Sequence, residues 1–213
     1  MQIVLATDIF GETKWTQAIV VKWRKQGHQV LSVSPYEELL QFAGESEAYA
    51  QFTEAGGFDA YCHKITRLHQ EKLMQSQALY IGFSAGGAAL WRVLSEVESG
   101  TQSHLIAFYP GQIRHHLDLS PKVATSLVFP KQEQHFDLSP VIEYLVTKPE
   151  VNIIQNGKLH GYANPESDQY DQSASSKVFD LLCDVSKCAN AASFSRASLL
   201  LSEDHKIVKS ITR

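Results

Sequence analysis

The chain has 213 residues, 44% of them hydrophobic, which is enough to bury one substantial core. Its formal net charge of −4 gives no support for binding nucleic acid or an anionic membrane surface. The three cysteines, Cys62, Cys183 and Cys188, contain no C-x-x-C pair and predict no disulfide framework. No apolar run is long enough for a signal peptide or a membrane span, so we expect a cytoplasmic protein.

Strand-like and helix-like segments alternate along the chain. In chain order, the sequence predicts strands at 2–7, 29–33, 78–81, 104–109, 124–129 and 151–155, and helices at 14–26, 35–43, 58–75, 85–98, 139–147 and 171–187. The continuous apolar runs are typical of strands that are buried on both faces. Six strands with helical crossovers predict an α/β fold, with a mainly parallel sheet flanked by helices on both faces.

The last residues are harder to assign. Residues 1–187 read as one domain, and residues 188–213 as a C-terminal extension. In that extension, two short apolar runs, 199–201 and 207–208, flank the polar stretch 202–206. The pattern leaves open a small hairpin and a frayed, flexible tail.

The segment 79–91 carries the strongest functional pattern. A short apolar strand leads into Gly82-Phe83-Ser84-Ala85-Gly86, and a small-residue helix follows. This strand–turn–helix context predicts a nucleophile elbow, in which a strained turn lifts the hydroxyl of Ser84 clear of the chain. Glycines at 82 and 86 are expected because a side chain there would clash with the folded backbone. The start of the helix directs N–H groups toward a developing oxyanion.

The loop after the first strand is the expected second half of an oxyanion hole. In parallel sheets the chemistry gathers at the carboxyl ends of the strands, and the turn 8–12 follows the first of them. We expect the backbone N–H groups of Ile9 and Ala85 to bind the oxyanion together. Asp8, in the same turn, reads mainly as a carboxylate that fixes the loop, although it could also steer the resting serine.

A base and an acid follow later strands, in the order that this elbow architecture requires. His160 follows the strand 151–155 and is the expected general base. Glu133 and Asp137 both follow the strand 124–129, and either carboxylate could orient the imidazole. Glu133 is the preferred acid, and Asp137 the alternative, because Asp137 could equally cap the following helix. His205, beside Asp204, is a competing base in the C-terminal extension.

No metal site is expected. The adjacent pair His115-His116 has no evident third ligand, and neighbouring residues point in different directions.

Three segments together carry a resemblance to a known family: Asp8-Ile9-Phe10-Gly11, the elbow 82–87, and His160-Gly161-Tyr162-Ala163-Asn164-Pro165. Over roughly residues 1–185 the chain resembles the dienelactone hydrolase family of α/β-hydrolases. The resemblance implies a compact α/β-hydrolase, and its acid position best matches Glu133. The resemblance implies founding members that use a Cys-Asp-His triad, whereas this chain has Ser84 at the position of the nucleophile. The arginine expected shortly after the histidine is absent, which argues against dienelactone itself as the substrate.

The expected function is a serine hydrolase that cleaves small carboxylic esters, lactones or thioesters through an acyl-enzyme. Its expected partner is a small-molecule ester-type substrate, and it would work without a metal or organic cofactor, as a monomer or small homo-oligomer. The alternative is a hydrolase-fold binding or regulatory protein with little turnover.

Overall fold

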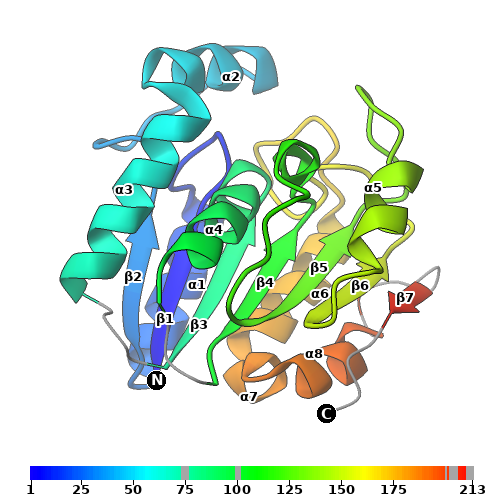
Figure 1. Cartoon of the computed structure of the whole chain (residues 1–213). Coiled ribbons are helices and arrows are strands. Elements are labelled where there is room, and N and C mark those ends of the chain that lie inside the picture. The colour runs from blue at the N-terminus through cyan, green and yellow to red at the C-terminus, as the bar shows by residue number, and fades with distance from the viewer. Residues whose placement is uncertain (73–76, 99–101, 200, 202–205, 210–213) are drawn as a thin grey trace.

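One sheet of seven strands organises the chain (Figure 1). The computed structural model describes residues 1–72, 77–98, 102–199, 201 and 206–209. The strand order is β2-β1-β3-β4-β5-β6-β7, in which only β7 runs antiparallel to its neighbour. The strands are β1 (Gln2–Ala6), β2 (Gln29–Val33), β3 (Ala78–Phe83), β4 (His104–Phe108), β5 (Ala124–Phe129), β6 (Val151–Gln155) and β7 (Lys206–Lys209).

Helices cover both faces of the sheet, which confirms the predicted α/β architecture (Figure 1). One face is covered by α3 (Gly57–Lys72), α4 (Ala85–Glu96), the short 3₁₀ helix η1 (Gly111–His115) and α5 (Ser139–Leu145), and α2 (Glu45–Glu54) packs on α3 beyond the ends of the strands (Figure 1). The other face is covered by α1 (Lys14–Lys25), α6 (Gln172–Cys183), α7 (Val185–Cys188) and α8 (Ala191–Ser198). A sheet buried in this way needs apolar side chains on both sides of its central strands, which explains their continuous apolar runs.

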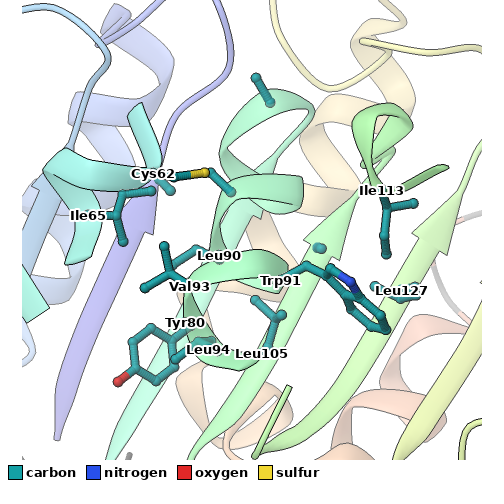
Figure 2. Close-up of a cluster of buried hydrophobic side chains, with 14 of the residues drawn as sticks. Cys62, Ile65, Tyr80, Leu90, Trp91, Val93, Leu94, Leu105, Ile113 and Leu127 are labelled. Carbon is teal, nitrogen blue, oxygen red and sulfur yellow. The ribbon is translucent and has the colours of Figure 1, made fainter. Parts of the chain in front are cut away.

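The helix that follows the elbow lies at the centre of one core layer. Figure 2 shows Leu90 and Trp91 of α4 among side chains of the neighbouring strands and of η1. Trp91 is fully buried, and its indole N–H donates to the carbonyl of His116 at 2.9 Å. This bond ties the segment after β4 to α4. The middle of α4 is thereby held between the sheet and the segment that contains η1.

The predicted helix at 35–43 is wrong: this stretch is a loop, and the helix α2 begins only at Glu45. The backbone N–H of Tyr36 donates to the hydroxyl of Ser34 at 3.1 Å, a local bond that competes with helix formation. The hydroxyl of Tyr36 donates to the carbonyl of Ile9 at 2.5 Å. Tertiary contacts therefore hold this segment beside the loop that follows β1.

The predicted long helix at 171–187 is interrupted. Asp184 has φ −99° and ψ 82°, which is not helical, and it separates α6 from α7. Its carboxylate accepts a 2.5 Å hydrogen bond from the hydroxyl of Ser186. A short polar side chain that bonds locally favours such a break.

The C-terminal segment adds one helix, α8, to a face of the sheet and one strand, β7, to its edge. Phe194 of α8 is fully buried. Three polar side chains on neighbouring strands hold the segment: His104 contacts the carbonyl of Cys188 at 2.9 Å and the hydroxyl of Ser126 at 3.0 Å, and Asn152 donates to the carbonyl of Ala191 at 3.3 Å. Strand β7 pairs with β6, so its described residues join the main sheet, while residues 202–205 lie outside the described part of the chain.

Of the helices in the described ranges, none combines the length and the apolar character that crossing a membrane would demand.

Candidate active site

Ser84 lies at a sharp turn between the end of β3 and the start of α4. Its backbone has φ +47° and ψ −115°, a region that residues with a side chain seldom adopt. The backbone N–H of Ser84 donates to the carbonyl of Phe108 at 2.9 Å, so the neighbouring strand β4 helps to hold the turn. The structure thus has the strained strand–turn–helix geometry that the sequence predicts for residues 79–91.

Two glycines allow this turn to form. A Cβ atom on Gly82 would lie 2.5 Å from the Cα of Gly87. A Cβ atom on Gly86 would overlap the backbone carbonyl oxygen of Thr7, at the end of β1. Only glycine permits these approaches, which bring the first turn of α4 against the loop after β1.

A continuous chain of hydrogen bonds joins Ser84, His160 and Glu133. The hydroxyl oxygen of Ser84 lies 2.8 Å from Nε2 of His160. Nδ1 of His160 lies 3.0 Å from each carboxylate oxygen of Glu133. Because an ionised carboxylate only accepts hydrogen bonds, Nδ1 carries the proton in this arrangement and Nε2 is free to accept one from the serine. The Glu133 side chain is 7% exposed and that of His160 is 24% exposed.

The structure brings Glu133, and not Asp137, to the imidazole. Asp137 accepts a hydrogen bond from the backbone N–H of Ser139 at 2.9 Å, at the start of α5. Its side chain therefore satisfies one of the free N–H groups at a helix N-terminus. His205, the competing base considered from the sequence, lies outside the described residues.

The donors expected to form the oxyanion hole lie in two segments that pack together. Ala85 is the first residue of α4, and Ile9 lies in the loop after β1. Within the described ranges, neither the N–H of Ile9 nor that of Ala85 has a hydrogen-bond partner. By contrast, the N–H of Phe10 donates to the carboxylate of Asp8 at 3.0 Å. The two N–H groups predicted from the sequence are thus free to receive a ligand oxygen.

Residues after β4 form a wall of the site that the sequence did not reveal. Tyr109 has φ +40°, and its ring centroid lies 5.0 Å from that of His160. A Cβ atom on Gly111 would lie 3.4 Å from Oε1 of Glu133 and 3.5 Å from Cε1 of His160. In the sequence, this wall is marked only by Pro110-Gly111, which ends the strand. A Pro-Gly pair predicts a turn, but it does not predict contact with Glu133 or His160.

Asn164 is a second residue that the sequence did not single out for a role. Its side-chain amide donates to the carboxylate of Asp8 at 2.7 Å. Burial raises the pKa of Asp8 to about 6, although the hydrogen bonds from Asn164 and Phe10 act in the opposite direction. The contacts of Asp8 agree with the loop-fixing role considered for it.

The pair His115-His116 lies at the end of η1 and just after it. The ring of His116 stacks on that of Phe58, with centroids 5.2 Å apart. In the part of the chain that the structure describes, no group of three or more His, Cys, Asp or Glu side chains is placed to hold a metal ion.

The comparison with known sequences places the chain beside one curated relative. No protein-family model matches it. The chain is 26% identical over 185 residues to YczH of Bacillus subtilis (strain 168), which is described as an uncharacterized protein. The match covers 84% of this chain and 89% of the relative.

Solved structures resemble the chain along most of its length at low sequence identity. P91, a dienelactone hydrolase-like promiscuous phosphotriesterase from metagenomic libraries, superposes with a TM-score of 0.62 at 13% identity, covering 88% of this chain and 86% of P91. A candidate dienelactone hydrolase from Klebsiella pneumoniae superposes with a TM-score of 0.63 at 9% identity. The superposition covers 95% of this chain and 86% of the Klebsiella protein. A candidate hydrolase of the α/β superfamily from Xanthomonas campestris superposes with a TM-score of 0.60 at 12% identity. The superposition covers 87% of this chain and 98% of the Xanthomonas protein. The chain therefore has the α/β-hydrolase fold.

Proposed function

We propose that the protein is a serine hydrolase that cleaves small carboxylic esters, lactones or thioesters through an acyl-enzyme. The observation that carries this proposal is the hydrogen-bonded chain from Ser84 through His160 to Glu133, built on a strained elbow. Strain at a serine that faces an imidazole is typical of an activated nucleophile. The fold shared with dienelactone hydrolase-like proteins adds support.

In the proposed reaction Ser84 forms a covalent intermediate. Its hydroxyl oxygen attacks the substrate carbonyl carbon while His160 Nε2 takes the proton. The negative charge that develops on the carbonyl oxygen is stabilised by the N–H groups of Ile9 and Ala85, at roughly 3–4 kcal/mol per donor. His160 then gives its proton to the departing alcohol or thiol, which leaves Ser84 acylated.

Water completes the cycle by the same route. His160 removes a proton from the water as its oxygen attacks the acyl carbon, and returns that proton to Ser84 as the acid product leaves. Glu133 stays ionised throughout. It keeps the Nδ1 proton in place, so that Nε2 faces the serine, and it stabilises the imidazolium that forms at each step.

A fluorophosphonate probe tests the nucleophile directly. We expect stoichiometric labelling of wild-type protein at Ser84 and none of Ser84→Ala. Ser176→Ala, at an exposed serine on α6, should label like wild type. Hydrolysis of p-nitrophenyl esters of graded acyl length would then define the acyl preference. A folded wild-type protein that neither labels nor turns over any ester would refute the proposal and favour a binding or regulatory protein.

A further inference from the structure

A buried hydrogen bond joins the two loops that carry the proposed oxyanion donor and the proposed base. Asn164 Nδ2 donates to Asp8 Oδ2 at 2.7 Å, across 156 residues of sequence. Asp8 is 6% exposed and Asn164 is 2% exposed. Ile9 directly follows Asp8, and Asn164 lies one turn after His160. The bond therefore lies next to the proposed oxyanion donor, the N–H of Ile9, and close in sequence to the proposed base, His160.

Each partner also holds the backbone of its own loop. Asp8 Oδ1 accepts from the N–H of Phe10 at 3.0 Å, and Asn164 Oδ1 accepts from the N–H of Glu166 at 3.0 Å. These bonds fix the orientation of the Asn164 amide, because its oxygen is used within its own loop and its NH₂ group must face Asp8. They also occupy the N–H of Phe10 and leave that of Ile9 to the site.

A carboxylate is a costly choice for a role that concerns only the loop. An asparagine at position 8 could accept the Phe10 N–H as well, without a buried charge. Burial raises the pKa of Asp8 to about 6, with Glu45 adding to the rise and His160 opposing it. Burial raises the pKa of three tyrosines packed nearby, Tyr36, Tyr61 and Tyr109, and the charge of Asp8 adds to each rise. Perturbed buried carboxylates of this kind gather at functional sites.

We propose that Asp8 and Asn164 are a positioning pair that sets the Ile9 N–H relative to Ser84 and His160. The inference rests on the proposed hydrolase function for its kinetic consequence. The pair touches neither the substrate nor the reacting atoms. Its effect on the reaction comes from alignment, since a displacement of about 1 Å in a catalytic group can cost 10²-fold in rate.

Exchanging the two residues gives a sharp test. In Asp8→Asn, two NH₂ groups face each other, because the Asn164 oxygen is needed by Glu166. In Asn164→Asp, two carboxyl groups face each other. The double variant Asp8→Asn/Asn164→Asp restores all the bonds. Its amide at position 8 can accept from Phe10 and donate to the carboxylate at position 164, which can still accept from Glu166. Asp184→Asn, the same chemical change between α6 and α7, is the control.

We expect each single variant to lower kcat for a p-nitrophenyl ester by about 10-fold or more, with KM changed by no more than about twofold. The double variant should recover most of the lost kcat, and Asp184→Asn should match wild type. A role in stability alone would lower the thermal midpoint without this kcat-specific loss and recovery. Single variants with wild-type kcat, or a folded double variant no better than either single one, would overturn the proposal.

Hydrogen exchange read by mass spectrometry tests the pair without turnover. Backbone amides in 9–12 and 160–167 should exchange faster in both single variants and return toward wild-type rates in the double variant. This readout stays decisive if no ester is hydrolysed, so failure of the proposed function and failure of the positioning pair are distinguishable. Unchanged exchange in both loops of the single variants would count against the pair.

Discussion

The backbone N–H of Lys131 donates to the carbonyl of Lys158 at 2.7 Å, and this bond aligns the two loops that supply acid and base. Each lysine precedes a proposed catalytic residue by two positions, Glu133 in one loop and His160 in the other. Since the loops follow neighbouring parallel strands, β5 and β6, the bond continues their pairing beyond the sheet. The carboxylate reaches the imidazole because of this short backbone connection.

The acid is tested by Glu133→Gln. A neutral amide cannot stabilise the imidazolium or hold its tautomer as a carboxylate does, so we expect kcat to fall by several orders of magnitude. The free energy of unfolding should change little. Steady-state kinetics with a short-chain p-nitrophenyl ester, beside urea unfolding, measures both quantities.

Asp137→Asn is the matched control for that experiment. Asparagine also caps helices, so we expect a loss of stability of roughly 1 kcal/mol or less and turnover close to wild type. The opposite pattern, with turnover lost in Asp137→Asn and kept in Glu133→Gln, would identify Asp137 as the acid.

The strain at the elbow predicts a trade-off between stability and activity. Ser84→Ala and Ser84→Gly should both abolish hydrolysis, while the fold persists. Only glycine accepts φ +47° and ψ −115° without strain, which for other residues costs about 1–3 kcal/mol. We therefore expect Ser84→Gly to be more stable than Ser84→Ala by about 1 kcal/mol in urea unfolding. Because glycine also adds entropy to the unfolded chain, equal stability of the two variants would contradict the prediction and would mean that the strain does not exceed that entropy cost of about 0.5–1 kcal/mol.

His104 predicts sensitivity of the fold to acid. Burial lowers its pKa to about 4, compared with 6.5 for an unperturbed histidine. The folded protein therefore binds fewer protons than the unfolded chain in this window, and stability falls as the pH drops from about 6.5 to 4. The full contribution is roughly 3 kcal/mol. Urea unfolding at several pH values should show a weaker loss of stability on acidification in His104→Gln than in wild type.

Asp8 acts with the opposite sign over nearly the same range. Its pKa rises from 3.8 to about 6 on folding, so its contribution is present at low pH and is lost as the pH rises through this range. In the wild-type protein the contributions of His104 and Asp8 to the pH dependence of the free energy of unfolding therefore partly cancel. His104→Gln and Asp8→Asn each remove one contribution and show the other. A stability difference between wild type and His104→Gln that does not depend on pH would exclude a buried neutral histidine.

The short connection between β4 and β5 predicts a preference for small acyl groups. Only residues 109–123 separate these strands, and η1 occupies part of that stretch, so this connection, all of it described, is too short to hold an inserted cap domain. We expect kcat/KM to be highest for acetyl to butyryl p-nitrophenyl esters and to fall for longer chains. A steady rise from acetyl to dodecanoyl esters would contradict the prediction.

The sequence by itself determined the features that depend on local patterns. The apolar runs of the central strands predict a sheet buried on both faces, and Gly82 is needed because a Cβ atom there would meet the backbone of Gly87, five residues further along the chain. Such constraints act between residues close in the chain, so they are legible without a structure.

Only the tertiary structure decided the contacts that depend on how separate segments meet. Glu133 and Asp137 follow the same strand, and the choice between them follows from the bond that joins Lys131 to Lys158. The Asp8–Asn164 bond, the loop at 35–44 and the attachment of α8 depend in the same way on partners distant in sequence. A buried polar side chain must find a hydrogen-bond partner inside the folded protein. Which partner lies within reach depends on how the whole sheet and its helices pack, and a local sequence pattern carries no information about that packing.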